Sequence, residues 1–233
     1  KKFLSIVGIN PDLLAGHSLG EYSALVASGS IDFKEALILV HKRGLFMEQS
    51  EVGSMFAILN LNIETIQTIC SEVSSKLNQI VSPANINSPN QVVIAGSHEA
   101  AALASEKCKA AGAKRSIQLK VSVASHCNLM QSASVLISKE MENVKFKNPL
   151  IPVIHNINAL ESSDNNIAQK LTDQLIKPVQ WLKTMEKINM LDGIVVECGP
   201  GRVLSGLAKT NGLSNILTMS SDNFQQEFNS VYG

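Results

Sequence analysis

The sequence has no surplus of charge of either sign. Its 20 lysine and arginine residues are matched by 20 aspartate and glutamate residues in a chain of 233. Nucleic acids and anionic membranes attract proteins through a long-range electric field, which a balanced chain does not provide. We therefore expect neither as a partner, and an acidic ligand would have to be held by local groups.

Cysteine is scarce and shows no metal-binding spacing. The four cysteines, Cys70, Cys108, Cys127 and Cys198, form no CxxC pair, which argues against a zinc site, and nothing suggests a disulfide framework. Reduced thiols fit the cytosol best. The chain also lacks an apolar run as long as a membrane helix, and Lys1 to Gly8 is too short for a signal peptide. These absences predict a soluble, cytoplasmic protein that binds no metal.

What the sequence does contain is an alternation of strand and helix patterns. Pro11 to Gly16 predicts a strand that enters a sharp turn, and Glu21 to Ala27 predicts a helix. Apolar residues then recur at helical spacing from Phe33 to Met47. Further on, the pattern predicts helices over 129–144, 167–176 and 179–190, and strands over 152–155 and 193–197. This alternation predicts an α/β fold, with a mostly parallel sheet and flanking helices.

Residues 54 to 119 follow a different order. The pattern predicts a strand over 55–61, a helix over 63–75, strands over 80–86 and 91–95, a helix over 99–111 and a strand over 116–121. The order βαββαβ is typical of a ferredoxin-like unit, a small antiparallel sheet with two helices on one face. We interpret residues 54–119 as a subdomain inserted into a core made of residues 1–53 and 120–233.

Gly16-His17-Ser18-Leu19-Gly20 has the form of a nucleophile elbow, GxSxG. Both glycines permit a backbone turn too tight for a Cβ atom, which would expose the Ser18 hydroxyl at the sheet edge, where it can attack a thioester. The amide of Leu19 would point into the same space and stabilise an oxyanion. Taken alone the pattern is also typical of a glycine-rich turn with a capping serine.

The residues around this turn resemble the acyltransferase family of fatty-acid and polyketide synthesis. The stretch from Gly16 reads GHSLGEYSAL, and the family has GHSxGE there. Further blocks match in the same order: Arg43, NxNSP at 85–89 followed by QVVIAG, SHC at 125–127, QxxxPVxW at 174–181 and ECGPG at 197–201. The resemblance covers essentially the whole chain, and stand-alone bacterial members match it best. It implies transfer of a malonyl group from malonyl-CoA to the phosphopantetheine thiol of acyl carrier protein, through an acyl group on Ser18, in fatty-acid biosynthesis.

A serine nucleophile needs a base, and the resemblance assigns that role to His126, which follows a predicted strand over 118–122. His17 is a poor base, because neighbours in an extended stretch point to opposite faces, so we expect it to line the substrate site instead. The same reasoning sets Cys127 aside as a nucleophile. No Asp or Glu stands at a suitable position to orient the imidazole. The resemblance implies that the main-chain carbonyl of Gln174 does so.

The resemblance also implies the groups that bind the substrates. Arg43 would hold the free carboxylate of the malonyl group in a bidentate pair. Asn85 and Asn87 would line the pocket, although a turn before proline favours asparagine in any case. Lys114 and Arg115 would meet the acidic carrier protein and the phosphates of CoA, and a solvated surface pair is equally compatible with them. No cofactor is expected, because a thioester is already activated.

The chain departs from the family at its beginning. Members start with a strand and a loop carrying GQGxQ, which supplies a second oxyanion donor, and here we expect Lys1 to Asn10 to correspond to the helix that enters the elbow strand. Two other functions therefore stay open. One is a serine thioesterase of the α/β-hydrolase type, which the position of the last histidine, His155, disfavours because that fold places its histidine near the C-terminus. The other is a carrier-protein-binding module without turnover.

Overall fold

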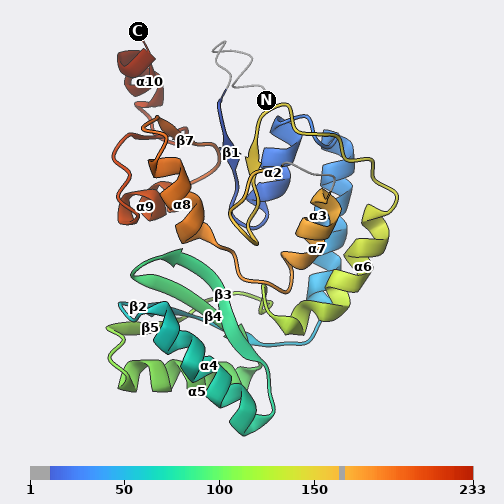
Figure 1. Ribbon diagram of the computed structural model, residues 1–233, viewed down its shortest axis with the longest axis vertical. Helices are drawn as coiled ribbons and strands as arrows, with labels where there is room; N and C mark the ends of the chain where they lie inside the picture. The colour runs from blue at the N-terminus through green and yellow to red at the C-terminus, as the bar shows by residue number, and fades with distance from the viewer. Residues whose placement is uncertain (1–10, 163–165, 233) are drawn as a thin grey trace. The chain divides into compact units, whose positions relative to one another are not determined.

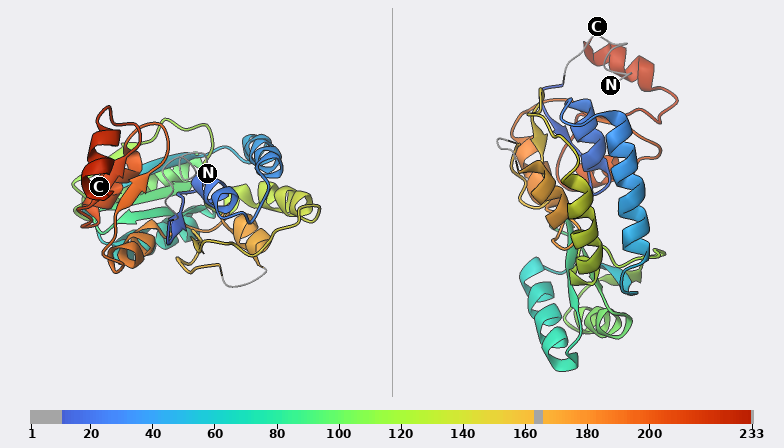
Figure 2. Two further views of the ribbon diagram at one scale, coloured as in Figure 1. Left: turned by 90° about the horizontal axis from the view of Figure 1, so that it is seen from above. Right: turned by 90° about the vertical axis from the view of Figure 1, so that its right-hand side faces the viewer.

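The computed structural model describes residues 11–162 and 166–232, so the helix expected over Lys1 to Asn10 lies outside the described residues. The chain divides into two compact units, the first ending at Trp181 and the second beginning at Leu182. Figures 1 and 2 show the elements of each unit. No helix among the described residues is long and apolar enough to cross a membrane.

The elbow part of the first unit is built around two short parallel strands. Strand β1 (Leu14–Ala15) pairs with β6 (Val153–Ile154), Leu14 opposite Val153. After β1 the chain turns into α2 (Gly20–Ala27) and continues through α3 (Phe33–Glu48), whose N-terminus is capped by the Asp32 side chain. The other helices here are the 3₁₀ helix η1 (Asn128–Met130), α6 (Gln131–Met141) and α7 (Ile167–Asp173).

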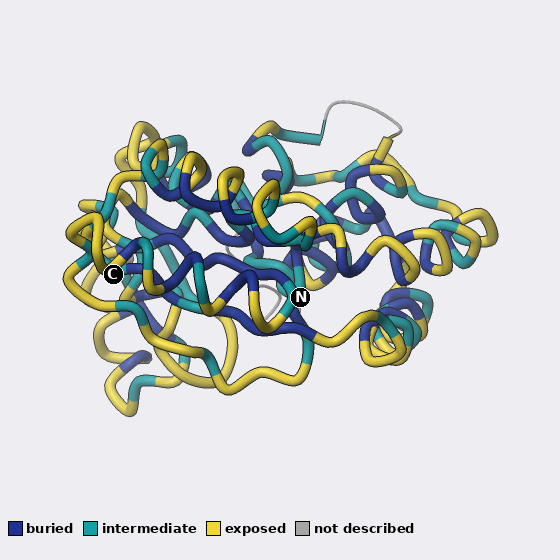
Figure 3. The backbone as a smooth tube through the Cα atoms, turned by 90° about the horizontal axis from the view of Figure 1, so that it is seen from below, coloured by how far each residue is buried: buried dark blue, intermediate teal, exposed yellow. Residues whose placement is uncertain are grey.

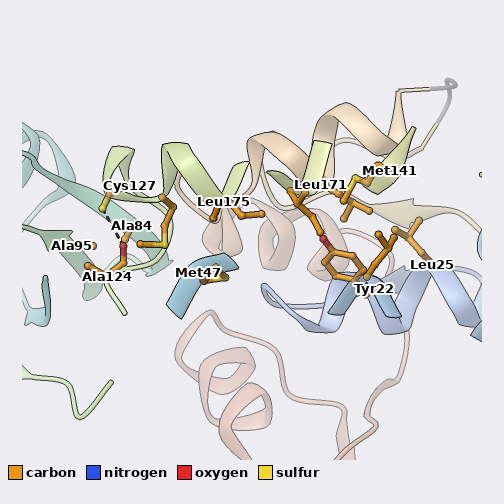
Figure 4. Packing of buried hydrophobic residues seen from close by; sticks show 14 of the residues in the cluster. Tyr22, Leu25, Met47, Ala84, Ala95, Ala124, Cys127, Met141, Leu171 and Leu175 are labelled. Atoms are coloured by element: carbon orange, nitrogen blue, oxygen red, sulfur yellow. Dashed lines mark hydrogen bonds between the residues drawn. The ribbon is translucent and has the colours of Figure 1, made fainter. Parts of the chain in front are cut away.

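One hydrophobic core holds these helices together. Tyr22 and Leu25 on α2 pack in the same cluster as Met141 at the end of α6 and Leu171 on α7, as Figure 4 shows. Full burial of one such side chain stabilises a fold by about 1.5–3 kcal/mol. In Figure 3 the helices alternate between buried and exposed positions, as expected for helices with one face on a core.

The middle of the first unit has the predicted βαββαβ order. It runs β2 (Ser54–Leu59), α4 (Ile63–Leu77), β3 (Val81–Ser88), β4 (Gln91–Gly96), α5 (His98–Ala110) and β5 (Arg115–Gln118). The sheet order is β3-β4-β2-β5, all neighbours are antiparallel, and α4 contacts α5 (Figure 1). A second hydrophobic cluster, including Ile66, Val73 and Ile94, fills this part. The α/β fold class with its ferredoxin-like part is confirmed. The boundaries at residues 53/54 and 119/120 stay a prediction.

Two backbone hydrogen bonds connect this sheet to the chain after α7. The amide of Ile86 donates to the carbonyl of Val179 at 2.9 Å, and the amide of Val179 donates to Ala84 at 2.9 Å. The segment of β3 that carries Asn85 is thereby joined to the segment that follows Gln174.

One strand prediction was wrong. The structure has no strand over 118–122 before His126, because β5 ends at Gln118. Its partner β2 begins at Ser54, and the last bond of the pair, from the amide of Leu119 to Met55, lies at that end. Beyond Leu119 the described residues offer no strand to pair with, and the chain reaches His126 as irregular backbone.

The second unit contains two short parallel strands and helices. Helix α8 (Trp181–Asn189) leads into it, followed by β7 (Val195–Glu197), α9 (Val203–Thr210), β8 (Ile216–Thr218) and α10 (Phe224–Tyr232). Glu197 caps α9, because its carboxylate accepts hydrogen bonds from the amides of Leu204 at 3.0 Å and Ser205 at 2.8 Å. The elements after β7 were not anticipated from the sequence.

Candidate active site

Ser18 stands in the turn between β1 and α2 with φ at +52°, in the left-handed region. The turn is closed by hydrogen bonds from the amide of Gly20 to His17 and from the amide of Glu21 to Ser18. A Cβ atom at Gly16 would lie 2.0 Å from backbone atoms of Gly20, so only glycine fits there. At Gly20 no described atom lies within 4 Å of that position, apart from its chain neighbours and the backbone of its own helix. The expectation that both glycines relieve a clash is therefore wrong for Gly20.

The hydroxyl of Ser18 meets His126. Ser18 Oγ lies 2.9 Å from His126 Nε2, and His126 Nδ1 lies 2.6 Å from the carbonyl oxygen of Gln174. A carbonyl only accepts, so Nδ1 carries the proton and the lone pair of Nε2 faces the serine. Gln174 follows the last residue of α7, where main-chain carbonyls have no partner within the helix. This arrangement can remove a proton from Ser18 without an acidic third member.

Asp173, the acid next to Gln174, does not orient the imidazole of His126. Asp173 Oδ2 accepts a hydrogen bond from Lys177 Nζ at 2.7 Å, and Asp173 Oδ1 accepts one from Gln169. Both oxygens of Asp173 are thus engaged with side chains of its own segment.

Burial makes the imidazole of His126 a weak base. The side chain is 2% exposed. Desolvation lowers the pKa of His126 to about 3, the positive charge of Arg43 acts in the same direction, and the bond to Gln174 opposes both. His126 is therefore neutral at physiological pH, the form in which it can accept a proton.

Arg43 provides a buried cation beside the nucleophile. It lies on the buried face of α3 with Leu39 and Met47. Its Nη2 atom donates to Ser18 Oγ at 3.1 Å and to Gln174 Oε1 at 3.3 Å. Its Nε atom has no hydrogen-bond partner among the described residues, and none of the ion pairs there includes Arg43. Burial lowers the pKa of Arg43, and the negative charge of Glu21 acts in the opposite direction.

His17 makes two contacts of its own, one with Asn87 and one with Trp181. Asn85 and Asn87 are both buried, and His17 Nε2 lies 2.9 Å from Asn87 Oδ1. The His17 ring also packs edge-on against Trp181, with 5.2 Å between centroids. Burial lowers the pKa of His17. His17 is thus held by Asn87 and Trp181, while the hydroxyl of Ser18 is held by other residues.

The remaining predicted residues are exposed. The side chain of Leu19 is 49% exposed beside Ser18. Lys114 and Arg115 are exposed. They lie at the end of the β2–β5 pair where Arg115 pairs with Leu59, and Ser54 lies at the other end of β2. No described hydrogen bond brings either basic side chain to Ser18, and their role stays a prediction.

Three buried residues at the site were not singled out from the sequence: Glu21, His155 and Asn156. The amide of Ser18 donates to Asn156 Oδ1 at 2.6 Å, and Asn156 Nδ2 donates to the carbonyl of Gly16 at 2.6 Å. Glu21 accepts from His155 and Gln174 at 2.6 and 2.7 Å. The available signal was Glu21 itself, an acid inside the elbow motif on a helix whose neighbours are apolar.

Comparison with known proteins decides the family. A family model described as acyl transferase domain matches residues 2–213.

The chain belongs to the acyl transferase domain family. The resemblance drawn from the motifs is thereby confirmed. As in the motif analysis, the match extends over both the elbow and the βαββαβ part of the chain. In the described residues, no group of three or more metal-binding side chains is present.

Relatives within this acyl transferase family are close. The chain is 46% identical over 208 residues to the malonyl CoA-acyl carrier protein transacylase of Escherichia coli strain K12, a match that covers 87% of this chain. It spans 66% of that relative's length, just under two thirds. A solved acyl carrier protein S-malonyltransferase from Vibrio cholerae superposes with a TM-score of 0.92 at 40% identity, covering 97% of this chain and 76% of the other.

A second solved structure contains a partner. It is a type II polyketide-synthase acyl-carrier protein in complex with its malonyl-transacylase, similar to this chain with a TM-score of 0.90 and 41% identity. The match covers 99% of this chain and 76% of that one.

Proposed function

We propose that this chain transfers a malonyl group from malonyl-CoA to the phosphopantetheine thiol of acyl carrier protein, through an acyl-enzyme on Ser18, in fatty-acid biosynthesis. The observation that carries the proposal is the buried guanidinium of Arg43. It lies 3.1 Å from the serine hydroxyl and pairs with no described carboxylate. A buried cation with no carboxylate in direct contact is costly, and an acyl group that ends in a carboxylate supplies that contact.

Two matched half-reactions follow from the geometry. First, Ser18 Oγ bonds to the thioester carbon while its proton passes to His126 Nε2; the carbon–sulfur bond then breaks, and CoA leaves as the thiol with that proton. Second, the carrier thiol gives its proton to Nε2, its sulfur attacks the serine ester, and Ser18 Oγ leaves and takes the proton back. One base serves both steps, since the second reverses the first.

The names of the relatives support the choice of substrates. The Escherichia coli relative is a malonyl CoA-acyl carrier protein transacylase, and one similar structure holds an acyl-carrier protein with its malonyl-transacylase. We extend these substrates to this chain, with Asn85 and Asn87 lining the acyl pocket and the amide of Leu19 as an oxyanion donor. Lys114 and Arg115 would contact the acidic carrier. The reaction requires no cofactor, and we assign it to the cytoplasm.

Intact-protein mass spectrometry tests the proposal. Incubation with malonyl-CoA should add the mass of one malonyl group to the wild-type chain, and later addition of phosphopantetheinylated carrier protein should move that mass to the carrier. The Ser18→Ala variant is the control that should gain nothing. Release of free malonate without transfer would favour a thioesterase. Carrier binding without an adduct would favour a non-catalytic binding module.

A further inference from the structure

Glu21 is an acid that the reaction itself does not use. It lies in the first turn of α2 and is 1% exposed. Its carboxylate accepts three hydrogen bonds: from His155 Nδ1 at 2.6 Å, from the amide of Asn156 at 3.1 Å and from Gln174 Nε2 at 2.7 Å. A buried carboxylate with three donors is held in one place, because each lost bond would leave a desolvated group.

Two of the three donors, Gln174 and Asn156, also hold the reacting residues His126 and Ser18. Gln174 receives the Nδ1 proton of His126 on its main-chain carbonyl. Asn156 holds the amide of Ser18 with its side-chain oxygen and the carbonyl of Gly16 with its side-chain nitrogen. Glu21 therefore connects the support of the base with the support of the nucleophile, although it touches neither reacting atom.

The carboxylate also fixes which way the Gln174 carboxamide points. A carboxylate can only accept, so the NH₂ group of Gln174 must face Glu21, and its second proton goes to the carbonyl of Ser18 at 3.1 Å. The oxygen Oε1 is left to face Arg43 Nη2 at 3.3 Å. With the carboxamide reversed, two donor groups would meet at Arg43, and the guanidinium would have to move.

We propose that Glu21 is a positioning residue that aligns Ser18 with His126 and, through the Gln174 carboxamide, orients the guanidinium of Arg43 toward the acyl carboxylate. The second half of this statement rests on the proposed malonyl transfer, and the first half does not. The purely structural alternative is that Glu21 only holds His155 in place, whose Nε2 lies against the hydroxyl of Ser162 on the far side.

The test compares Glu21→Gln with Glu140→Gln in the whole chain. Glutamine has nearly the shape of glutamate, but it presents an NH₂ group where a carboxylate accepted. Glu140 is the matched control, since it pairs with Lys42, the neighbour of Arg43 on α3, and has no described contact with the site. A fluorophosphonate measures the alignment of Ser18 without any acyl preference: the Oγ–P bond forms, the P–F bond breaks, fluoride leaves and the serine proton passes to His126.

We expect Glu21→Gln to slow fluorophosphonate labelling by about tenfold or more, because small displacements of reacting groups have effects of this size. The ratio of malonyl to acetyl transfer should also fall by about tenfold as Arg43 loses its fixed orientation. In Glu140→Gln, the labelling rate and the ratio of malonyl to acetyl transfer should both stay within about twofold of wild type. The ratio is measured on one sample, so it does not depend on how much of the variant is folded. Glu21→Asp, which keeps the charge but is one methylene shorter, replaces Glu21→Gln if the latter does not fold, with an intermediate loss expected.

The outcomes separate this inference from the proposed function. If wild type labels at Ser18 but accepts no malonyl group, the proposed function fails, and the labelling rates alone then decide whether Glu21 aligns Ser18 with His126. If Glu21→Gln lowers only thermal stability and matches Glu140→Gln in labelling rate and in acyl ratio, the positioning role is overturned. Loss of labelling together with a changed ratio supports it.

Discussion

The guanidinium of Arg43 and the imidazole of His126 share one oxygen atom, the hydroxyl of Ser18, at 3.1 and 2.9 Å. A positive charge is therefore held next to the base that must accept a proton. This charge contributes to the lowered pKa of His126. A substrate carboxylate bound to Arg43 would offset it, so the acyl group that is bound should influence the strength of the base.

Removal of the nucleophile gives the simplest prediction. Ser18→Ala should abolish the malonyl adduct in intact-mass spectra, because no other hydroxyl in the described part of the chain is bonded to His126. His126→Ala should keep the nucleophile but form the adduct about 10²–10⁴ times more slowly, the usual contribution of a positioned base. An adduct of full yield in Ser18→Ala would assign the nucleophile elsewhere.

Arg43→Ala should change the preference between acyl groups. Hydrogen bonds to charged groups contribute about 1.5–3 kcal/mol, so we expect malonyl transfer to fall by about 10- to 100-fold relative to acetyl transfer. Competition between malonyl-CoA and acetyl-CoA measures the ratio. Lys34→Ala, an exposed change on the same helix, is the control. Equal loss of both transfers would mean that Arg43 supports the fold and does not bind the carboxylate.

The pH dependence of acylation should distinguish charged from uncharged reagents. With a neutral fluorophosphonate, labelling of Ser18 should stay constant as the pH falls through 6.5, because burial keeps the pKa of His126 at about 3. In the malonyl-CoA complex the charge of Arg43 is offset, which raises the pKa of His126. The acylation rate should then begin to fall at a higher pH than it does with the fluorophosphonate. Single-turnover rates from pH 4 to 8 measure both. If the rates with both reagents fall together near pH 6.5, the result would contradict the burial of the imidazole.

The imidazole of His126 should make the free energy of unfolding depend on pH. Folded His126 stays neutral down to about pH 3, whereas the unfolded residue binds a proton near pH 6.5. The unfolded state binds more protons between these values, so the free energy of unfolding should decrease as the pH falls through that range. His126→Gln should show a smaller decrease between pH 6.5 and 4 in urea titrations. An unchanged slope would assign the acid sensitivity to other groups.

Lys114 and Arg115 give a prediction about the partner. Replacing both with alanine should raise the KM for the carrier protein and weaken its salt dependence, while acylation by malonyl-CoA changes less. Steady-state kinetics over a series of salt concentrations would show this. Carrier kinetics that do not change would make these two residues ordinary solvated surface.

The sequence allowed the elbow, the order of elements through β7 and the βαββαβ part to be predicted, because each depends on local signals. Periodicity indicates helices such as α3, and glycine indicates the turn at Gly16. The same local reasoning failed before His126, where the apolar pattern favoured a strand but β2 offered no further partner. Whether a strand forms depends on a second segment that is distant in the sequence.

The site was predicted in part, for a related reason. Ser18, His126, Arg43 and Gln174 were recognised by resemblance, and the structure brings them together by hydrogen bonds. Glu21, His155 and Asn156 were missed, because Glu21 in isolation is an ordinary acid in the first turn of a helix. Its partner His155 lies 134 residues away. A single sequence without an alignment contains no signal that joins the two.

The positive φ angle of Ser18 implies a trade-off between durability and turnover. A residue with a side chain in the left-handed region costs about 1–3 kcal/mol, and glycine avoids most of that cost. Ser18→Gly and Ser18→Ala both remove the hydroxyl, but only the glycine variant relaxes the backbone. We therefore expect Ser18→Gly to melt at a higher temperature than Ser18→Ala in calorimetry. The backbone strain at residue 18 would then lower thermal stability, and selection for heat resistance alone would favour glycine over serine at this position.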